Sequence, residues 1–288
     1  MSDTAGALSG LSAIAGRYDV VLSDVWGVVH NGVAAYPSAV EALVKFRQAG
    51  GRVVLITNAP RPSGPIIAML DELGVPGGAY DSVVTSGDAT RTMIARYSGK
   101  VIHHVGPPTA DDALYEGLNV RRGTADEASA VVVTDLDTDD DTPDMYSDRI
   151  AHWRRRGLPL ICANPDKVVE IGEQIVYCGG ALADIYEELG GIVLMAGKPY
   201  APIYNEALAL AEKAVGHPVE RSRILAIGDS VRTDAMGAAD FGIDFLFITG
   251  SIHAGELDAF GEPDSEHIRN FVATTGARLA GFMPRLAW

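Results

Sequence analysis

Cysteine is scarce in this sequence, which contains only Cys162 and Cys178 among its 288 residues. Two cysteines are too few for the disulfide framework that stabilises small secreted domains. A chain of this length can instead bury a full hydrophobic core, as one large domain or as a core with an inserted domain. Neither cysteine stands beside a histidine or within a recognisable motif, so both are interpreted as small buried hydrophobic residues.

Basic residues are also few: 23 Lys and Arg stand against 38 Asp and Glu, which gives a formal net charge of -15. Nucleic-acid affinity depends on clustered Lys and Arg, so this balance disfavours nucleic-acid binding as the main activity. The one dense basic cluster, Arg154 to Arg156, is expected at the C-terminal end of a helix, facing solvent.

Long apolar runs are absent, and the first residues, MSDTAGALSGLSAIAG, lack a basic start. Neither a secretory signal nor a membrane anchor is therefore indicated. We expect a cytoplasmic protein that does not act at a membrane. No internal repeat or low-complexity tract suggests a repeat architecture.

Several short segments are apolar throughout rather than alternating, as in strands of a parallel sheet covered on both faces by helices. They are residues 20–25, 52–58, 82–87, 223–230 and 244–250. Between the first two, residues 37–51 have the spacing of an amphipathic helix, with a capping box of Ser38 and Glu41 at its start and Gly50 at its end. This strand, helix and strand predict a right-handed crossover and a Rossmann-like, doubly wound α/β core.

A second α/β unit is predicted inside the first. Residues 88–190 contain strand candidates in KVIHHVG, AVVVTDL and LPLICAN and a helix in DMYSDRIAHWRRRG. The predicted organisation is thus a core domain of residues 1–87 and 191–288 with an inserted domain of residues 88–190. The apolar segment 267–288 is expected to pack on the core, with a subunit contact as the alternative.

Polar side chains follow the predicted core strands where each strand ends: Asp24, Thr57 with Asn58, Ser86 and Asp229. Ligands of such sheets bind beyond the carboxyl ends of the strands. A carboxylate that attacks a phosphoryl group needs a divalent cation and hydrogen-bond donors for the phosphate oxygens. Mg²⁺ retains several waters, so two aspartates and a backbone carbonyl would suffice to hold it.

The segments DVWGV, LITNAP, GKP and GDSVRTD resemble, in order and context, the four motifs of the haloacid dehalogenase superfamily, and more narrowly its class IIA, the NagD-like phosphatases. Members of this class carry an α/β cap between the second and third motifs, where residues 88–190 stand here. Asn164-Pro165-Asp166 matches a segment typical of that class. The resemblance covers nearly the whole chain.

This resemblance implies a Mg²⁺-dependent phosphatase of a small phosphorylated metabolite, such as a sugar phosphate or nucleotide. Asp24 would be the nucleophile that forms an aspartyl-phosphate, Lys198 the charge neutraliser, and Asp229 with Asp234 the metal ligands. Thr57 and Asn58, with Lys198, would bind the phosphate. The inserted domain would act as a cap that selects the substrate, and class IIA proteins are often homo-oligomers.

The chain departs from the family pattern at Trp26, which stands where the family places a second aspartate that moves the proton of the leaving group. The metal would still receive the Trp26 backbone carbonyl. A positioned acid or base contributes roughly 10² to 10⁴ in rate, so we expect a slower phosphatase or one that needs a good leaving group.

His30 is a candidate replacement for this acid, with a histidine exposed in a turn as the alternative interpretation. Asn31-Gly32, flanked by valines, predicts a tight hairpin that would form a flap above Asp24.

Two other functions stay open. A protein that keeps the phosphate site but turns over slowly would act as a regulatory binder, with Trp26 as its mark. A metal-independent carbon-halogen hydrolase also tolerates a non-acidic residue at position 26, but GDSVRTD retains metal-type carboxylates and favours phosphoryl transfer.

Overall fold

The computed structural model describes residues 6–107, 111–171, 174–260 and 264–288. The chain forms two compact units. Unit 1 comprises residues 1–57, 67–84 and 198–288, and unit 2 comprises residues 58–66 and 85–197. The predicted insert, residues 88–190, lies inside unit 2, which also takes in residues 58–66, 85–87 and 191–197. Its role as a cap remains a prediction.

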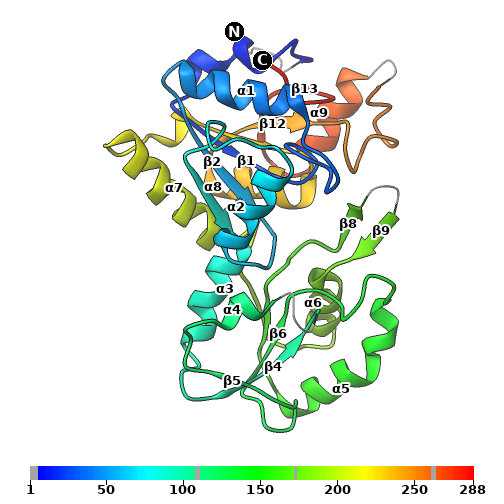
Figure 1. Ribbon diagram of the computed structural model, residues 1–288. Helices are drawn as coiled ribbons and strands as arrows, with labels where there is room; N and C mark the ends of the chain where they lie inside the picture. The colour runs from blue at the N-terminus through cyan, green and yellow to red at the C-terminus, as the bar shows by residue number, and fades with distance from the viewer. Residues whose placement is uncertain (1–5, 108–110, 172–173, 261–263) are drawn as a thin grey trace. The chain divides into compact units, whose positions relative to one another are not determined.

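Unit 1 is built on a six-stranded sheet in the order β13-β12-β11-β1-β2-β3 (Figure 1). The described strand pairs in it are parallel, which confirms the predicted Rossmann-like, doubly wound α/β core. Its strands are β1 (Val20–Ser23), β2 (Arg52–Thr57), β3 (Ser82–Thr85), β11 (Ile224–Gly228), β12 (Asp244–Ile248) and β13 (Arg278–Met283). Its helices are α1 (Pro37–Gln48), α2 (Ser63–Glu72, shared with unit 2), α7 (Ala201–Val215), α8 (Met236–Phe241) and α9 (Ser265–Ala273), with short turns η1 (Leu11–Ala13), η2 (Ala15–Arg17), η4 (Arg221–Arg223) and η5 (Val231–Ala235).

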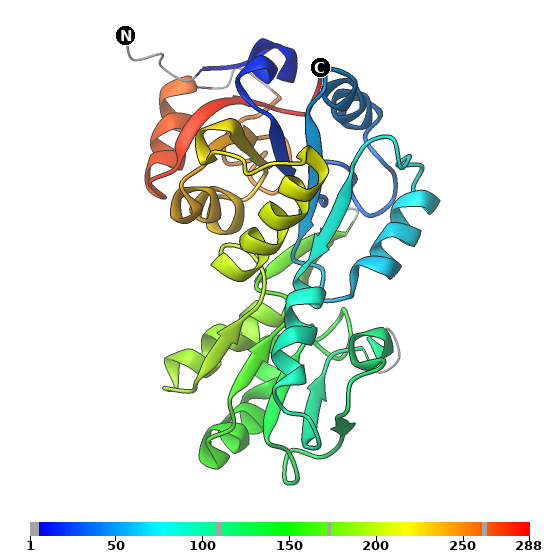
Figure 2. The same ribbon diagram turned by 90° about the vertical axis from the view of Figure 1, so that its left-hand side faces the viewer.

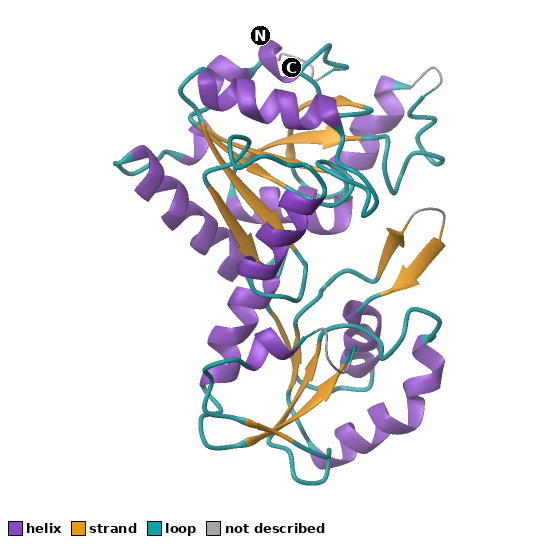
Figure 3. Ribbon diagram, in the orientation of Figure 1, coloured by secondary structure: helices purple, strands orange, loops and turns teal. Residues whose placement is uncertain are grey.

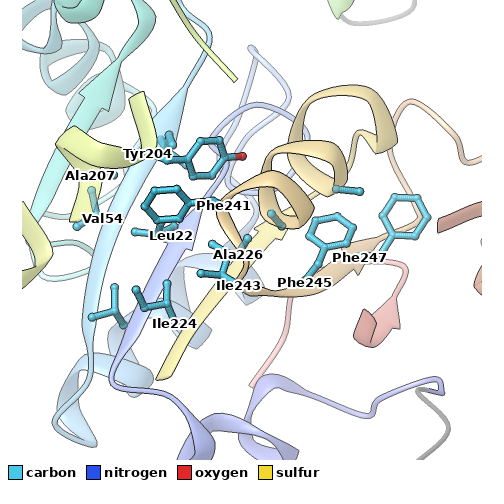
Figure 4. Close-up of a cluster of buried hydrophobic side chains, with 14 of the residues drawn as sticks. Leu22, Val54, Tyr204, Ala207, Ile224, Ala226, Phe241, Ile243, Phe245 and Phe247 are labelled. Carbon is cyan, nitrogen blue, oxygen red and sulfur yellow. The ribbon is translucent and has the colours of Figure 1, made fainter. Parts of the chain in front are cut away.

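The hydrophobic core of unit 1 follows from the apolar strands. Alternate residues of β1, β2, β11 and β12 point to one face of the sheet, where α7, α8 and α9 cover them. Figure 4 shows Tyr204 of α7 beside Phe241 of α8 in this cluster, with ring centroids 5.3 Å apart. Figure 2 shows α7 on one side of β2, and α1 with α2 on the other. Fully buried strands of this kind need helices on both faces.

Unit 2 contains a five-stranded sheet in the order β10-β7-β6-β4-β5 and a two-stranded sheet of β8 and β9 (Figure 3). One face of the larger sheet packs on α5 and α6, and the other on α3 and α4. The strands are β4 (Val101–Val105), β5 (Arg121–Arg122), β6 (Ala130–Val133), β7 (Leu160–Cys162), β8 (Val168–Ile171), β9 (Gln174–Tyr177) and β10 (Val193–Met195). The helices are α3 (Ser86–Ala95), α4 (Asp112–Tyr115), η3 (Pro143–Tyr146), α5 (Ser147–Arg156) and α6 (Gly179–Glu188).

The predicted capping box at the start of α1 is wrong. The N-cap is Tyr36, which makes no side-chain cap hydrogen bond, and the helix begins at Pro37. Proline suits the first helical position because its φ is fixed and its missing N–H is not needed there. Ser38 therefore lies inside the first turn, and Glu41 forms an ion pair with Lys45 at 2.7 Å.

The predicted hairpin at Asn31-Gly32 is also wrong in its geometry. A two-residue turn would pair His30 with Val33, but His30 forms an isolated bridge with Ala35. The reason lies in Asn31, whose side-chain oxygen accepts hydrogen bonds from the backbone N–H groups of Val33 and Ala34 at 3.0 and 2.9 Å. An asparagine that bonds to the backbone ahead of it here closes a wider turn than a two-residue hairpin allows.

The C-terminal segment packs on unit 1, as one of the two interpretations expected. β13 pairs with β12, Leu286 is fully buried, and the backbone N–H of Leu11 donates to the carbonyl of Ala287 at 2.7 Å. Both free cysteines are buried, as predicted. Within the described ranges, no helix has the length and apolar character needed to cross a membrane.

Candidate functional site

Three aspartates meet at the carboxyl edge of the unit 1 sheet. Asp24 follows β1 and Asp229 follows β11, and these strands are neighbours. Asp234 comes from the turn after Asp229, and one carboxylate oxygen from each residue lies within 4.8 Å of the others. All three side chains are buried. The parallel pairing of β1 and β11 brings residues 205 positions apart into one cluster because both strands end at the same edge.

The short π-helical turn η5 holds Asp234 in place. Ser230 caps this turn, since its hydroxyl oxygen accepts from the Thr233 N–H at 3.4 Å. The backbone N–H of Ser230 donates to Oδ2 of Asp234 at 3.1 Å. A Cβ on Gly228 would come within 2.1 Å of the Asp234 carboxyl carbon. Position 228 therefore needs glycine for this carboxylate to fold back over the strand end.

Lys198 connects two of the three carboxylates. Its Nζ donates to Oδ1 of Asp24 at 2.6 Å and to Oδ1 of Asp234 at 2.7 Å, and the lysine side chain is only 3 % exposed. Burial raises the pKa of Asp24 well above its ordinary value; Lys198 lowers this pKa, while Asp234 and Asp229 raise it further. One ammonium group does not balance three buried carboxylates, so the cluster favours additional positive charge.

The donor set fits a hard divalent cation. Its ligand atoms are all carboxylate oxygens, which Mg²⁺ and Ca²⁺ prefer over nitrogen or sulfur. In the described part of the chain, no other group of three His, Cys, Asp or Glu side chains comes this close together.

The predicted phosphate-binding pair is divided between the two units. Thr57 ends β2, next to β1 in the unit 1 sheet, and its side chain is buried. Asn58 is the first residue of unit 2, and its amide Nδ2 donates to Oδ1 of Asp166 at 3.1 Å. This aspartate belongs to the segment Asn164-Pro165-Asp166. The phosphate-binding roles of Thr57 and Asn58 remain predictions.

Trp26 packs into the loop that follows Asp24. Its ring contacts that of His30 edge to face, with centroids 5.1 Å apart. Gly32 has a φ of +84°, and a Cβ there would lie 2.5 Å from Cη2 of Trp26. A side chain at position 32 would therefore collide with the indole, so the packing of Trp26 in this loop requires glycine there. The Trp26 ring therefore supplies packing for this loop.

The histidine of this loop is fully buried, so the interpretation of His30 as an exposed turn residue is wrong. Its Nδ1 accepts from the Gly32 N–H at 2.9 Å, which leaves the ring proton on Nε2. Nε2 has no hydrogen-bond partner among the described residues, and burial lowers the pKa of His30 to about 4. The ring is thus neutral at pH 7, and its role as a substitute acid remains a prediction.

Two residues near the aspartates were missed at the sequence level. A Cβ on Gly27, whose φ is +77°, would lie 2.0 Å from Oδ2 of Asp229 and 2.4 Å from Oγ of Ser251. The backbone after Trp26 therefore passes directly over Asp229, which only glycine permits. A glycine next to a candidate site residue was the available signal for Gly27. Nothing in the local sequence marks Ser251, which this tertiary approach alone brings close.

Comparisons with known proteins agree with this arrangement. A family model described as haloacid dehalogenase-like hydrolase matches residues 21–118, and a second model, HAD-hydrolase-like, matches residues 195–273. The chain is 43% identical to a hydrolase of the haloacid dehalogenase-like family from Brucella suis 1330, with a TM-score of 0.87 over 97% of this chain and 99% of that one.

Two more distant relatives are phosphatases by name. The chain is 28% identical over 235 residues to the ribonucleotide monophosphatase NagD of Escherichia coli K12, which is 81% of this chain and 88% of that protein. It is 25% identical to a glycerol phosphate phosphatase from Mycobacterium tuberculosis, crystallised in complex with magnesium, with a TM-score of 0.64 over 87% of this chain and 74% of that one.

Proposed function

The chain belongs to the haloacid dehalogenase-like hydrolase family, and on this premise we propose that it is a Mg²⁺-dependent phosphatase of a small phosphorylated metabolite. A sugar phosphate or a nucleotide is the expected kind of substrate. Relatives at 28% and 25% identity are named as a ribonucleotide monophosphatase and a glycerol phosphate phosphatase, which supports a phosphoric monoester as the substrate.

The observation that carries this proposal is the placement of Lys198 between Asp24 and Asp234. An ammonium group at this point fixes one oxygen of Asp24 and offers positive charge where phosphate oxygens would gather. In the proposed reaction, an Asp24 carboxylate oxygen forms a bond to phosphorus while the bond from phosphorus to the ester oxygen breaks, and the departing oxygen takes up a proton. Water then cleaves the aspartyl-phosphate, which releases inorganic phosphate and restores the Asp24 carboxylate.

Asp24, Asp229, Asp234 and the backbone carbonyl of Trp26 would hold the Mg²⁺, which supplies positive charge for the phosphate oxygens and for the crowded carboxylates. Thr57 and Asn58 would donate hydrogen bonds to the same phosphate. The indole of Trp26 carries no acidic group that could give a proton to the departing oxygen. We therefore assign this protein low rates on esters of poor leaving groups, by the roughly 10² to 10⁴ that a positioned acid contributes.

Activity of the purified protein tests this function. With MgCl₂, release of inorganic phosphate is expected from p-nitrophenyl phosphate and from at least one member of a panel of sugar phosphates and ribonucleoside monophosphates. Asp24→Asn should lower this rate at least a thousandfold, because an amide is not a nucleophile toward phosphorus. Asp126→Asn is the matched control, since the Asp126 side chain is 80% exposed and lies in unit 2. Full activity in Asp24→Asn would contradict the proposal.

A regulatory phosphate binder is the second candidate, and the indole at position 26 is the observation that favours it. It predicts that orthophosphate binds in the presence of Mg²⁺ while no member of the panel is hydrolysed. A carbon-halogen hydrolase is the third, and activity on a haloacid that is unchanged by excess EDTA would support it instead.

A further inference from the structure

Arg285 carries an unusual guanidinium group. Its Cζ lies 4.6 Å from the ring centroid of Tyr36 and 5.3 Å from that of Phe260. Its Nη1 is buried without a hydrogen-bond partner among the described residues, where no other arginine has such a nitrogen. Stacking on aromatic rings stabilises the charge, but it leaves the in-plane N–H donors unused. A buried cationic donor without an acceptor is costly, and a bound anion would supply the acceptor that this group lacks.

The sheet topology places Arg285 at the same edge of the unit 1 sheet as the three aspartates. It follows β13, and the order β13-β12-β11-β1 leads from there to the strands that Asp229 and Asp24 follow (Figure 1). These strands are parallel, so all of them end at one edge. Two strand spacings separate β13 from β11, which is about 10 Å.

Close backbone contacts link Arg285 to the aspartates at this edge. The backbone N–H of Gly250 donates to the carbonyl of Pro284 at 3.0 Å, and Arg285 is the next residue. Ser251 follows Gly250, and its Oγ lies 2.4 Å from the position that a Cβ on Gly27 would occupy. Oδ2 of Asp229 lies 2.0 Å from that same position. A series of neighbouring residues within unit 1 therefore leads from Asp229 through Ser251 and Gly250 to the residue before Arg285.

The two rings position the guanidinium group from different segments. Tyr36 belongs to the segment that begins with Asp24, and its backbone N–H donates to the Val29 carbonyl at 2.7 Å. Contact with Tyr36 means that the Arg285 side chain extends from the edge strand toward the segment that follows β1. Phe260 is 66% exposed, and a Cβ on Gly250 would lie 2.7 Å from its Cζ. Glycine at 250 thus permits the approach that holds Phe260 beside Arg285.

We propose that Arg285 is a specificity-determining residue, which binds a second anionic group of the substrate, separate from the phosphate that is cleaved. This inference rests on the proposed phosphatase function and narrows its substrate class to phosphate esters that carry a further carboxylate or phosphate. The planar guanidinium matches both anions through paired N–H donors. A second anion beside three aspartates is repelled unless a cation such as Arg285 receives it.

Matched pairs of substrates test this proposal. 3-Phosphoglycerate and glycerol 3-phosphate share a three-carbon skeleton and differ in the carboxylate; fructose 1,6-bisphosphate and fructose 6-phosphate differ in the second phosphate. In Arg285→Gln, kcat/KM should fall at least tenfold for the two-anion member of one pair, mainly through KM, and less than threefold for its one-anion partner. Arg285→Lys, which keeps the charge but not the planar fork, should recover part of the loss.

Arg278→Gln is the control, because Arg278 is the first residue of β13, at the end of the strand away from Arg285 and the aspartates. Its side chain is 59% exposed. It should leave both members of each pair unchanged. Equal losses for both members in Arg285→Gln, or no loss in any pair, would overturn the role of Arg285.

The phosphatase function has a separate readout, which is phosphate release from p-nitrophenyl phosphate by the wild-type protein. If that release fails, the thermal stabilisation of wild type and Arg285→Gln by 3-phosphoglycerate and by fructose 1,6-bisphosphate with Mg²⁺ still tests the anion site. A shift in melting temperature that Arg285→Gln loses supports the site, and an equal or absent shift overturns it.

Discussion

The side chains of Trp26 and His30 pack against each other in the loop that follows Asp24. The indole packs against His30 and Gly32, so the loop after Asp24 is held by aromatic contact. A carboxylate at position 26 would have no such packing to offer. In the proposed mechanism, Trp26 therefore supplies packing where an aspartate would supply a proton, and its backbone carbonyl would still be available to hold the metal.

His30 should make the stability of unit 1 sensitive to acid. Its pKa is lowered from 6.5 to about 4 in the folded protein, so below pH 6.5 the unfolded chain binds a proton that the folded chain does not. Stability is therefore full above pH 6.5 and is lost as the pH falls toward 4, by up to about 1.4 kcal/mol per pH unit. In His30→Gln, urea unfolding between pH 6.5 and 4.5 should show a shallower decline than in wild type.

His267→Gln is the control for this measurement, since it removes an exposed histidine of α9 and should keep the wild-type decline. Parallel declines in wild type and His30→Gln would show that the buried imidazole does not set the acid sensitivity.

At the scale of elements, the loop of residues 24–36 depends on Gly32. Alanine there meets two penalties: a φ of +84° and a Cβ placed 2.5 Å from the Trp26 ring. Gly74→Ala isolates the first of these, because Gly74 has a φ of +83° with nothing near its Cβ position. We expect Gly74→Ala to cost about 1 to 2 kcal/mol and Gly32→Ala about 1 to 3 kcal/mol more, measured by urea unfolding. Equal losses of unfolding free energy in the two variants would mean that the Trp26 ring moves aside without measurable cost.

The elements predicted correctly are those whose signal is continuous along the chain. Five of the six strands of the unit 1 sheet, all except β13, lie within the predicted segments, because a strand buried on both faces needs hydrophobic residues throughout. The start of α1 and the turn at Asn31 were predicted wrongly, because Pro37 and the Asn31 side chain compete with the expected local geometry. The strand β13 was missed, because its sequence RLAGFM lacks a continuous apolar run and only its last three residues are buried.

At the scale of the whole molecule, the grouping of Asp24, Asp229 and Asp234 was foreseeable because parallel strands end at one edge. The approach of Gly27 to Asp229 and the stacking of Arg285 on Tyr36 were not. Both depend on loops whose paths are fixed by packing between segments far apart in the sequence. The sequence motifs therefore locate the aspartate cluster, while the contacts of these loops can be found only from the structure.

Calorimetric titration of Mg²⁺ into wild type, Asp229→Asn and Asp126→Asn tests the shared-cation claim most directly. Three carboxylates around one ion predict a single Mg²⁺ per chain, an affinity reduced at least tenfold in Asp229→Asn, and no change in Asp126→Asn. A tenfold loss corresponds to about 1.4 kcal/mol of binding free energy. Wild-type Mg²⁺ affinity in Asp229→Asn, or no Mg²⁺ binding by the wild-type protein, would contradict the claim.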